Sequence, residues 1–333
     1  MALLEMKDLT IYYKLQNGWV HAVDDINLKL ERGERIGLVG ESGCGKTTLA
    51  YTISFLLPNN AYVKEGTITF DEKNLTEIAV DKQGRIKMFA EGLRDIRWKQ
   101  ISLIFQSAMN SFNPVMSVGD QIIEAILAHE KITKEEARER VKQLYNIVGL
   151  PEDRIDSYPH EYSGGMKQRA LIAMAISLSP KLIIADEPTT ALDVITQDRI
   201  LAELVKLQQK MNSSMIVISH DISIVAQLST RIVIMYAGKI VEDASTREIF
   251  KNAKHPYTEA LLKAYPSAKG EKRRLLSIPG SPPDLVNPPQ GCRFNPRCPF
   301  AKPKCIEEEP KLREISPNHF VACHFSEEIY GVK

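Results

Sequence analysis

Short apolar runs alternate with longer amphipathic stretches along this chain, and this alternation predicts an α/β protein. Runs at residues 36–39, 101–105, 182–185 and 215–219 have the length and composition of buried strands. A helix is predicted at 47–57, after the loop that follows the first run. Buried parallel strands bring the loops that follow them to one edge of the sheet, where α/β proteins bind ligands.

Antiparallel strands are predicted on both sides of this pattern in the sequence. Residues 4–13 and 26–30 alternate as strands do and are joined by a polar turn that contains Asn and Gly. Residues 66–70 read as a further strand, and 231–242 as a closing hairpin. These segments predict an antiparallel β subdomain beside the parallel strands.

The middle of the chain changes to a period of 3.6, which is typical of amphipathic helices. Helices are predicted at 118–129, 134–148 and 166–177. Thr133 and Glu136 form the sequence pattern of a capping box at the start of the second helix. We expect an α-helical subdomain at about 107–180, inserted into the sheet.

The candidate chemistry begins at residues 40–48, which read Gly-Glu-Ser-Gly-Cys-Gly-Lys-Thr-Thr and fit the P-loop pattern. Glycines allow the backbone amides to turn toward phosphate oxygens, and the following helix directs its positive end to the same anion. Lys46 is expected on the β- and γ-phosphates, and the Thr47 hydroxyl on Mg²⁺. The expected phosphate-binding residues are Ser42, Gly43, Cys44, Gly45, Lys46, Thr47 and Thr48.

Polar residues also follow the later strands. Asp186 and Glu187 come directly after an apolar run, where Asp186 is expected to hold Mg²⁺ through its water shell and Glu187 to orient or deprotonate the attacking water. Gln106 follows another strand and is placed to reach the metal-bound water or the γ-phosphate. His220 follows a third, and γ-phosphate contact competes there with a capping or surface role.

Two further sites leave alternatives open. Ser163, Gly164 and Gly165 precede a helix and predict a second anion-binding N-terminus, although a plain N-cap turn explains the same residues. Tyr12 and Tyr13 end the first strand, where an aromatic ring can stack on a purine or lie half-buried in the sheet.

The net charge and the hydropathy of the chain argue against several classes of function and location. The 43 basic and 42 acidic residues leave a net charge of +1, so no general basic field points to nucleic acid. The apolar runs are too short to span a bilayer, and Glu5 and Asp8 interrupt any secretory pattern. We expect a cytosolic protein that at most docks on a membrane protein.

The last part of the chain differs in composition. Residues 251–333 are expected to form a proline-rich extension beyond a nucleotide-binding domain at 1–250. The extension contains four closely spaced cysteines, which match a Cys₄ metal site: Cys292, Cys298, Cys305 and Cys323. Because the short spacings that zinc prefers are absent, a [4Fe–4S] cluster is favoured over zinc, with free thiols or disulfides as a further alternative.

Taken in order, these motifs resemble the ATP-binding subunit of ABC transporters over the first 250 residues. The resemblance implies an α/β P-loop NTPase core that hydrolyses ATP with Mg²⁺. It also implies roles for residues at the matching positions, namely adenine stacking by Tyr13, the Q-loop at Gln106, contact of Ser163–Gly165 with the partner subunit's nucleotide, and the switch histidine at His220. Tyr162 and Met166 depart from the usual Leu and Gln of the signature segment.

The tail resembles the cysteine-rich C-terminal extension of dipeptide and oligopeptide importer ATPases, through the segments 255–258, 278–283 and 291–294. This resemblance implies a peripheral protein on the cytoplasmic face of the membrane. Its implied partners are a second, different ATPase subunit, two transmembrane permease subunits and an extracytoplasmic peptide-binding protein, with no nucleic acid. The alternative function is a soluble ABC ATPase that acts on DNA or ribosomes.

Overall fold

The computed structural model describes residues 2–105, 111–189, 194–264 and 278–331. Its internal contacts divide the chain into two compact units. Unit 1 contains residues 31–34 and 89–217. Unit 2 contains the ranges 2–30, 35–88 and 218–333.

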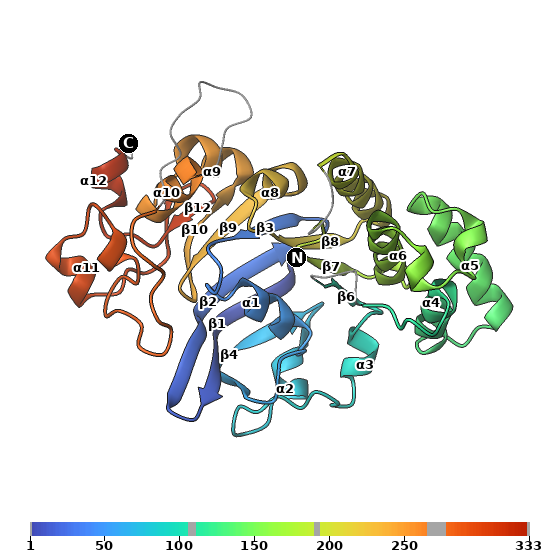
Figure 1. Cartoon of the computed structure of the whole chain (residues 1–333). Coiled ribbons are helices and arrows are strands. Elements are labelled where there is room, and N and C mark those ends of the chain that lie inside the picture. Colours follow the sequence, from blue (N-terminus) through green and yellow to red (C-terminus); the bar gives the residue numbers. More distant parts are fainter. Residues whose placement is uncertain (1, 106–110, 190–193, 265–277, 332–333) are drawn as a thin grey trace. The chain divides into compact units, whose positions relative to one another are not determined.

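Unit 2 begins with a long β-hairpin, which confirms the predicted antiparallel strands (Figure 1). A turn at residues 16–17 joins β1 (Ala2–Leu15) to β2 (Gly18–Glu31). β4 (Ala61–Phe70) pairs antiparallel with the other side of β1, and β5 (Lys73–Asn74) pairs with β4. The sheet order is therefore β2-β1-β4-β5.

The second sheet of unit 2 combines predicted and unpredicted strands. β3 (Arg35–Val39) runs parallel to β9 (Arg231–Tyr236), and β9 forms the predicted hairpin with β10 (Lys239–Ser245). β12 (His319–Val321) then pairs antiparallel with β10, and β11 (Arg313–Ser316) with β12. Two strands near the end of the chain thus extend the sheet that carries β3.

The helices of unit 2 are mostly short. The first, α1, ends at Ile53 and not at the predicted residue 57, because Phe55 has a φ of 52°, which a right-handed helix does not accommodate. The helices are α1 (Lys46–Ile53), α2 (Leu75–Ala79), α8 (Ile222–Leu228), α9 (Thr246–Asn252), α10 (Pro256–Ala264), α11 (Pro303–Glu307) and α12 (Ser326–Tyr330).

Unit 1 contains three further strands in the order β8-β7-β6. β6 (Ile101–Ile104) and β7 (Leu182–Asp186) are parallel, and every residue of β7 is buried. β8 (Ser214–Ile218) is also buried along its whole length, with its last residue counted in unit 2. These spans confirm the buried strands that the apolar runs predict.

The three helices predicted for the middle of the chain are present in unit 1, drawn in green in Figure 1. Thr133 and Glu136 make both hydrogen bonds of the predicted capping box, at 3.1 and 2.8 Å. Gly149, with a φ of 68°, lies just after the helix that Thr133 caps, where a glycine commonly ends a helix. The helices are α3 (Leu93–Ile96), α4 (Val118–Leu127), α5 (Lys134–Ile147), α6 (Gly164–Ile176) and α7 (Val194–Met211).

A buried carboxylate attaches the end of the chain to β10. Glu242 is fully buried, and its two oxygens accept the backbone N–H groups of Lys254 (2.6 Å) and His255 (3.1 Å). The Nε2 atom of His319, on β12, lies 2.7 Å from the same carboxylate. A buried carboxylate is stable only with such partners, so this network fixes the start of α10 and β12 against β10.

Replacing Glu242 with Gln tests this network. The amide NH₂ would face a backbone donor, so one buried donor is left unsatisfied at a cost of about 1–3 kcal/mol. We expect the free energy of unfolding, measured by denaturant titration, to fall by that amount. The matched control is Glu309→Gln, which removes an exposed pair with Lys239 and should cost less than about 1 kcal/mol. Equal losses in the two variants would contradict the assignment.

Candidate functional site

The P-loop of unit 2 connects β3 to α1 and closes tightly against neighbouring backbone. Gly45 has a φ of 103°, and a Cβ atom there would lie 2.1 Å from the carbonyl oxygen of Ala22. At Gly40 a Cβ atom would lie 2.2 Å from the carbonyl oxygen of Met235. Only glycine fits both the backbone angle and the space at Gly45, so the loop shape depends on this residue type.

The N-terminus of α1 is arranged to accept an anion. Gly45 is the N-cap residue, and it has no side chain that could cap the helix. The first-turn amides and the positive end of the helix dipole are therefore directed to a ligand. Ser42, Gly43 and Thr47 are exposed at this point, whereas Cys44 is buried, and burial raises the pKa of its thiol.

Lys46 is a buried cation that its own loop holds. Its Nζ atom donates to the carbonyl oxygens of Gly40 (2.8 Å) and Glu41 (2.9 Å), and the residue is 8% exposed. These bonds keep the ammonium group within the curve of the P-loop. This placement is compatible with the predicted role of Lys46 on nucleotide phosphates.

The two candidate tyrosines differ in their surroundings. The hydroxyl of Tyr13 lies 3.1 Å from the Thr48 hydroxyl on α1, so Tyr13 is next to the P-loop helix. Tyr12 instead has its ring centroid 4.0 Å from that of His21, and burial raises its pKa to about 12. Of the two residues, Tyr13 has the direct link to the P-loop helix.

The candidate signature segment lies in unit 1 at the start of α6. Ser163 is the N-cap, and its Oγ accepts the Met166 N–H at 3.3 Å, while Gly164 and Gly165 form the first turn. Tyr162 is buried, and its hydroxyl lies 2.8 Å from that of Tyr145 on α5. The unusual Tyr162 is therefore part of the helical core, and it leaves Ser163 exposed.

The two candidate acids of unit 1 lie at the end of β7, after its apolar residues. Asp186 is 1% exposed at the last position of the strand. Glu187 comes next, is half-buried and has a φ of 52°. A non-glycine residue in this region is strained by about 1–3 kcal/mol, and such strain concentrates at functional sites.

Of the two remaining predicted residues, the structure describes His220 but not Gln106. His220 is exposed and follows β8, just before Asp221 caps α8 through the Ser223 N–H at 2.8 Å. Gln106 lies outside the described residues, so the structure does not test it.

The prediction of a [4Fe–4S] cluster at the four terminal cysteines is wrong, and so is the zinc alternative. In residues 2–105, 111–189, 194–264 and 278–331, no group of three or more His, Cys, Asp or Glu side chains is arranged to hold a metal ion. The four residues are free cysteines: Cys292, Cys298, Cys305 and Cys323.

The surroundings of these cysteines give the physical reason. They line a cavity of about 10 Å³, which has room for about one water molecule. Burial raises the pKa of Cys292 to about 12 and that of Cys323 to about 11. Both shifts favour the neutral thiol over the thiolate, which is the form that binds metals.

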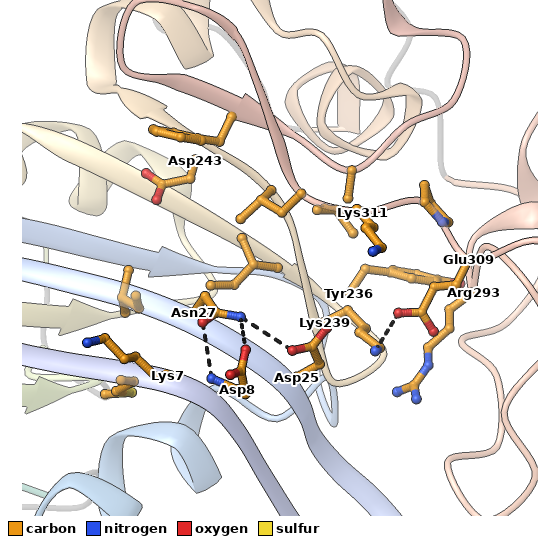
Figure 2. Close-up of a pocket in the computed structure, with 18 of the residues that line it drawn as sticks. Lys7, Asp8, Asp25, Asn27, Tyr236, Lys239, Asp243, Arg293, Glu309 and Lys311 are labelled. Carbon is orange, nitrogen blue, oxygen red and sulfur yellow. Dashed lines mark hydrogen bonds and ion pairs between the residues drawn. The ribbon is translucent and has the colours of Figure 1, made fainter. Parts of the chain in front are cut away.

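A separate pocket of about 860 Å³ lies in unit 2 (Figure 2). Its walls come from β1, β2, β10 and the segment after α11, and charged side chains of both signs line it. Lys239 pairs with Glu309 at 2.6 Å, and the Asn27 amide donates to Asp8 and Asp25. No P-loop residue is in its lining, so this pocket is not the phosphate site.

Sequence reasoning missed the residues that hold the P-loop from outside. Glu41 bonds to Tyr257 through its backbone and to Arg297 through its side chain. Tyr257 and Arg297 lie 216 and 256 positions after Glu41 in the sequence, so no local pattern could have identified them.

Among the helices that the structure describes, none has both the length and the apolar character needed to cross a membrane.

Comparison with known families identifies both parts of the chain. Residues 23–190 match the ABC transporter family, and residues 241–305 match the C-terminal region of oligopeptide/dipeptide transporters. The chain is 44% identical over 323 residues to the oligopeptide transport ATP-binding protein OppD of Bacillus subtilis, covering 96% of this chain and 87% of that protein. It is 42% identical to the dipeptide transport ATP-binding protein DppD of Escherichia coli, covering 98% and 97%.

Solved structures agree in fold. The dimeric structure of the ATP-binding cassette MJ0796 bound to ADP and Pi has a TM-score of 0.63 at 27% identity, covering 73% of this chain and 99% of that one. The cbiO1 protein of Clostridium perfringens, part of an ABC transporter complex, has a TM-score of 0.62 at 28% identity, covering 75% and 91%. The chain therefore has the ABC ATPase fold of mixed sheets and helices, and it belongs to the oligopeptide and dipeptide transport ATP-binding proteins of the ABC transporter family, which are ATPases.

Proposed function

We propose that this chain powers the import of dipeptides or oligopeptides by binding and hydrolysing ATP. The observation that carries the proposal is the match of residues 241–305 to the C-terminal region of oligopeptide/dipeptide transporters, together with relatives named for peptide transport over nearly the whole chain. Residues 1–250 would form the ATPase domain, with a helical subdomain at about 107–180. Residues 251–333 would form an extension that contains four thiols.

On the nucleotide side, we assign binding to residues of unit 2. Lys46 would contact the β- and γ-phosphates, the amides of the loop would surround them, and Tyr13 would stack on adenine. The exposed loop residues and the helix end without a side-chain cap support this assignment. His220 would contact the γ-phosphate.

The available donors suit Mg²⁺. The hydroxyl of Thr47, the carboxylate of Asp186 and the amide oxygen of Gln106 are hard oxygen ligands, which this ion prefers. When bound with ATP, Mg²⁺ would neutralise charge on the phosphates. Glu187 would orient the attacking water and accept its proton.

The assembly we propose contains four kinds of protein. A second, different ATPase subunit would pair with this chain, so that Ser163, Gly164 and Gly165 contact the nucleotide held by the partner. Two transmembrane permease subunits and an extracytoplasmic peptide-binding protein would complete the importer. The chain would then be a peripheral protein on the cytoplasmic face of the membrane. A function on DNA or ribosomes is not favoured by the relatives.

Glu187→Gln tests the catalytic assignment. Gln keeps the shape of the side chain but cannot accept a proton, so phosphate release should fall by about 10²- to 10⁴-fold. Binding of ATP, measured on the same preparation of the assembled importer, should remain, because Lys46 and the P-loop are intact. Glu139→Gln, on the exposed surface of α5, is the matched control and should hydrolyse ATP at the normal rate. Normal phosphate release by the Glu187 variant would contradict this role.

Purification of the tagged chain from detergent-solubilised membranes tests the assembly. We expect a second ATPase chain and two integral membrane proteins in the eluate, identified by mass spectrometry, with the peptide-binding protein added in the presence of peptide. Reconstituted vesicles should then accumulate labelled peptide only with ATP. Recovery of ribosomes or DNA with no membrane protein would instead favour the alternative function.

A further inference from the structure

The second residue of the P-loop is held by the end of the chain. Arg297 binds the Glu41 carboxylate with two parallel bonds, from Nη1 to Oε2 (2.7 Å) and from Nη2 to Oε1 (3.0 Å). The side chains are 5% and 23% exposed, so the pair is largely shielded from water. Shielded, bidentate pairs of this kind are the strong class of ion pair.

The same P-loop residue is also held through its backbone. The Glu41 N–H donates to the Tyr257 hydroxyl at 2.9 Å, and Tyr257 is fully buried on α10. Its ring packs against those of Tyr236 (4.6 Å between centroids) and Phe294 (5.4 Å). Glu41 is therefore held by two residues, Tyr257 and Arg297, which both lie after residue 250.

Arg297 is itself firmly positioned. Its Nε atom donates to the carbonyl oxygen of Pro279 at 2.8 Å, and its Nη1 atom also lies 3.2 Å from the Tyr236 hydroxyl. The bond to Glu41 raises the pKa of the guanidinium group further above its usual value, so Arg297 is always charged. The ion pair thus joins the P-loop to a part of the extension with little rotamer freedom.

Glu41, which Arg297 and Tyr257 hold, also contacts the lysine that is proposed to bind phosphate. Its carbonyl oxygen accepts a hydrogen bond from Lys46 Nζ at 2.9 Å. A shift of the Glu41 backbone would therefore move the ammonium group that faces the phosphates. If Arg297 were absent, the Glu41 carboxylate would also stand as an unpaired negative charge beside a triphosphate, and like charges repel.

We propose that Arg297 is a positioning residue for ATP, which acts through Glu41 to hold the P-loop in its binding shape and to neutralise a carboxylate next to the phosphates. The segment after residue 250 is thereby a working part of the nucleotide site. This inference rests on ATP binding by the P-loop and is independent of the transported solute.

The test measures ATP hydrolysis by the assembled importer with Arg297→Ala, Arg297→Lys and Glu41→Gln, and with the double variant that combines Arg297→Ala and Glu41→Gln. For Arg297→Ala we expect the KM for ATP to rise about tenfold, within the usual range of coupling between sites, with kcat changed less than about twofold. Arg297→Lys should give a smaller rise, because it keeps the charge but loses the two-pronged geometry. In the double variant KM should return toward normal, because no unpaired carboxylate remains.

The matched control is Arg313→Ala in the same extension. Arg313 also makes a two-pronged pair, with Glu327, but that pair is 41% and 45% exposed and does not touch the P-loop. Its KM for ATP should be unchanged. Thermal unfolding without nucleotide shows whether each variant is folded.

An unchanged KM in a folded Arg297→Ala variant would overturn the proposal, as would an equal rise in the Arg313 control. If Arg297→Ala does not fold, the test depends on Arg297→Lys. A normal KM for ATP in that variant would also reject the positioning role of Arg297. Failure of the wild-type importer to move peptide leaves this result unaffected, since the readout is the KM for ATP.

Discussion

The nucleotide site depends on a P-loop backbone that must keep its amides free for the ligand and yet stay in one shape. Gly45 achieves the shape with a left-handed φ and a close approach to Ala22. The Gly45 N-cap of α1 has no side chain to cap the helix, so the start of the helix can face a ligand. The bonds from Lys46 Nζ to the Gly40 and Glu41 carbonyl oxygens hold the loop from within. Tyr257 and Arg297 hold it from outside, through Glu41. Residues of the loop itself and residues far along the chain therefore both hold its shape.

The residues proposed to bind ATP and those proposed to cut it belong to different units. Lys46 and Tyr13 are in unit 2, whereas Ser163 and the acids after β7 are in unit 1. Each unit has its own buried strands and helices, so each preserves its share of the site locally.

The four cysteines show where spacing alone misleads. Their crowding in a proline-rich segment suggested a metal site, but spacing does not report side-chain burial. In the structure the thiols line a cavity with room for about one water molecule, and burial raises the pKa of Cys292 and Cys323. They act as small apolar groups that pack the end of the chain.

Local patterns were sufficient for most elements and for the motif order. The P-loop, the strand before Asp186 and the capping box at Thr133 depend on neighbours within a few residues, so their sequence signals survive in isolation. Tertiary structure decided the rest. Whether Glu242 is buried, whether β12 joins β10, and whether Arg297 meets Glu41 depend on segments 70 to 260 residues or so apart, which only folding brings into contact. The sequence determines which side chains can carry a charge, but the fold determines the partner of each one and how deeply it is buried.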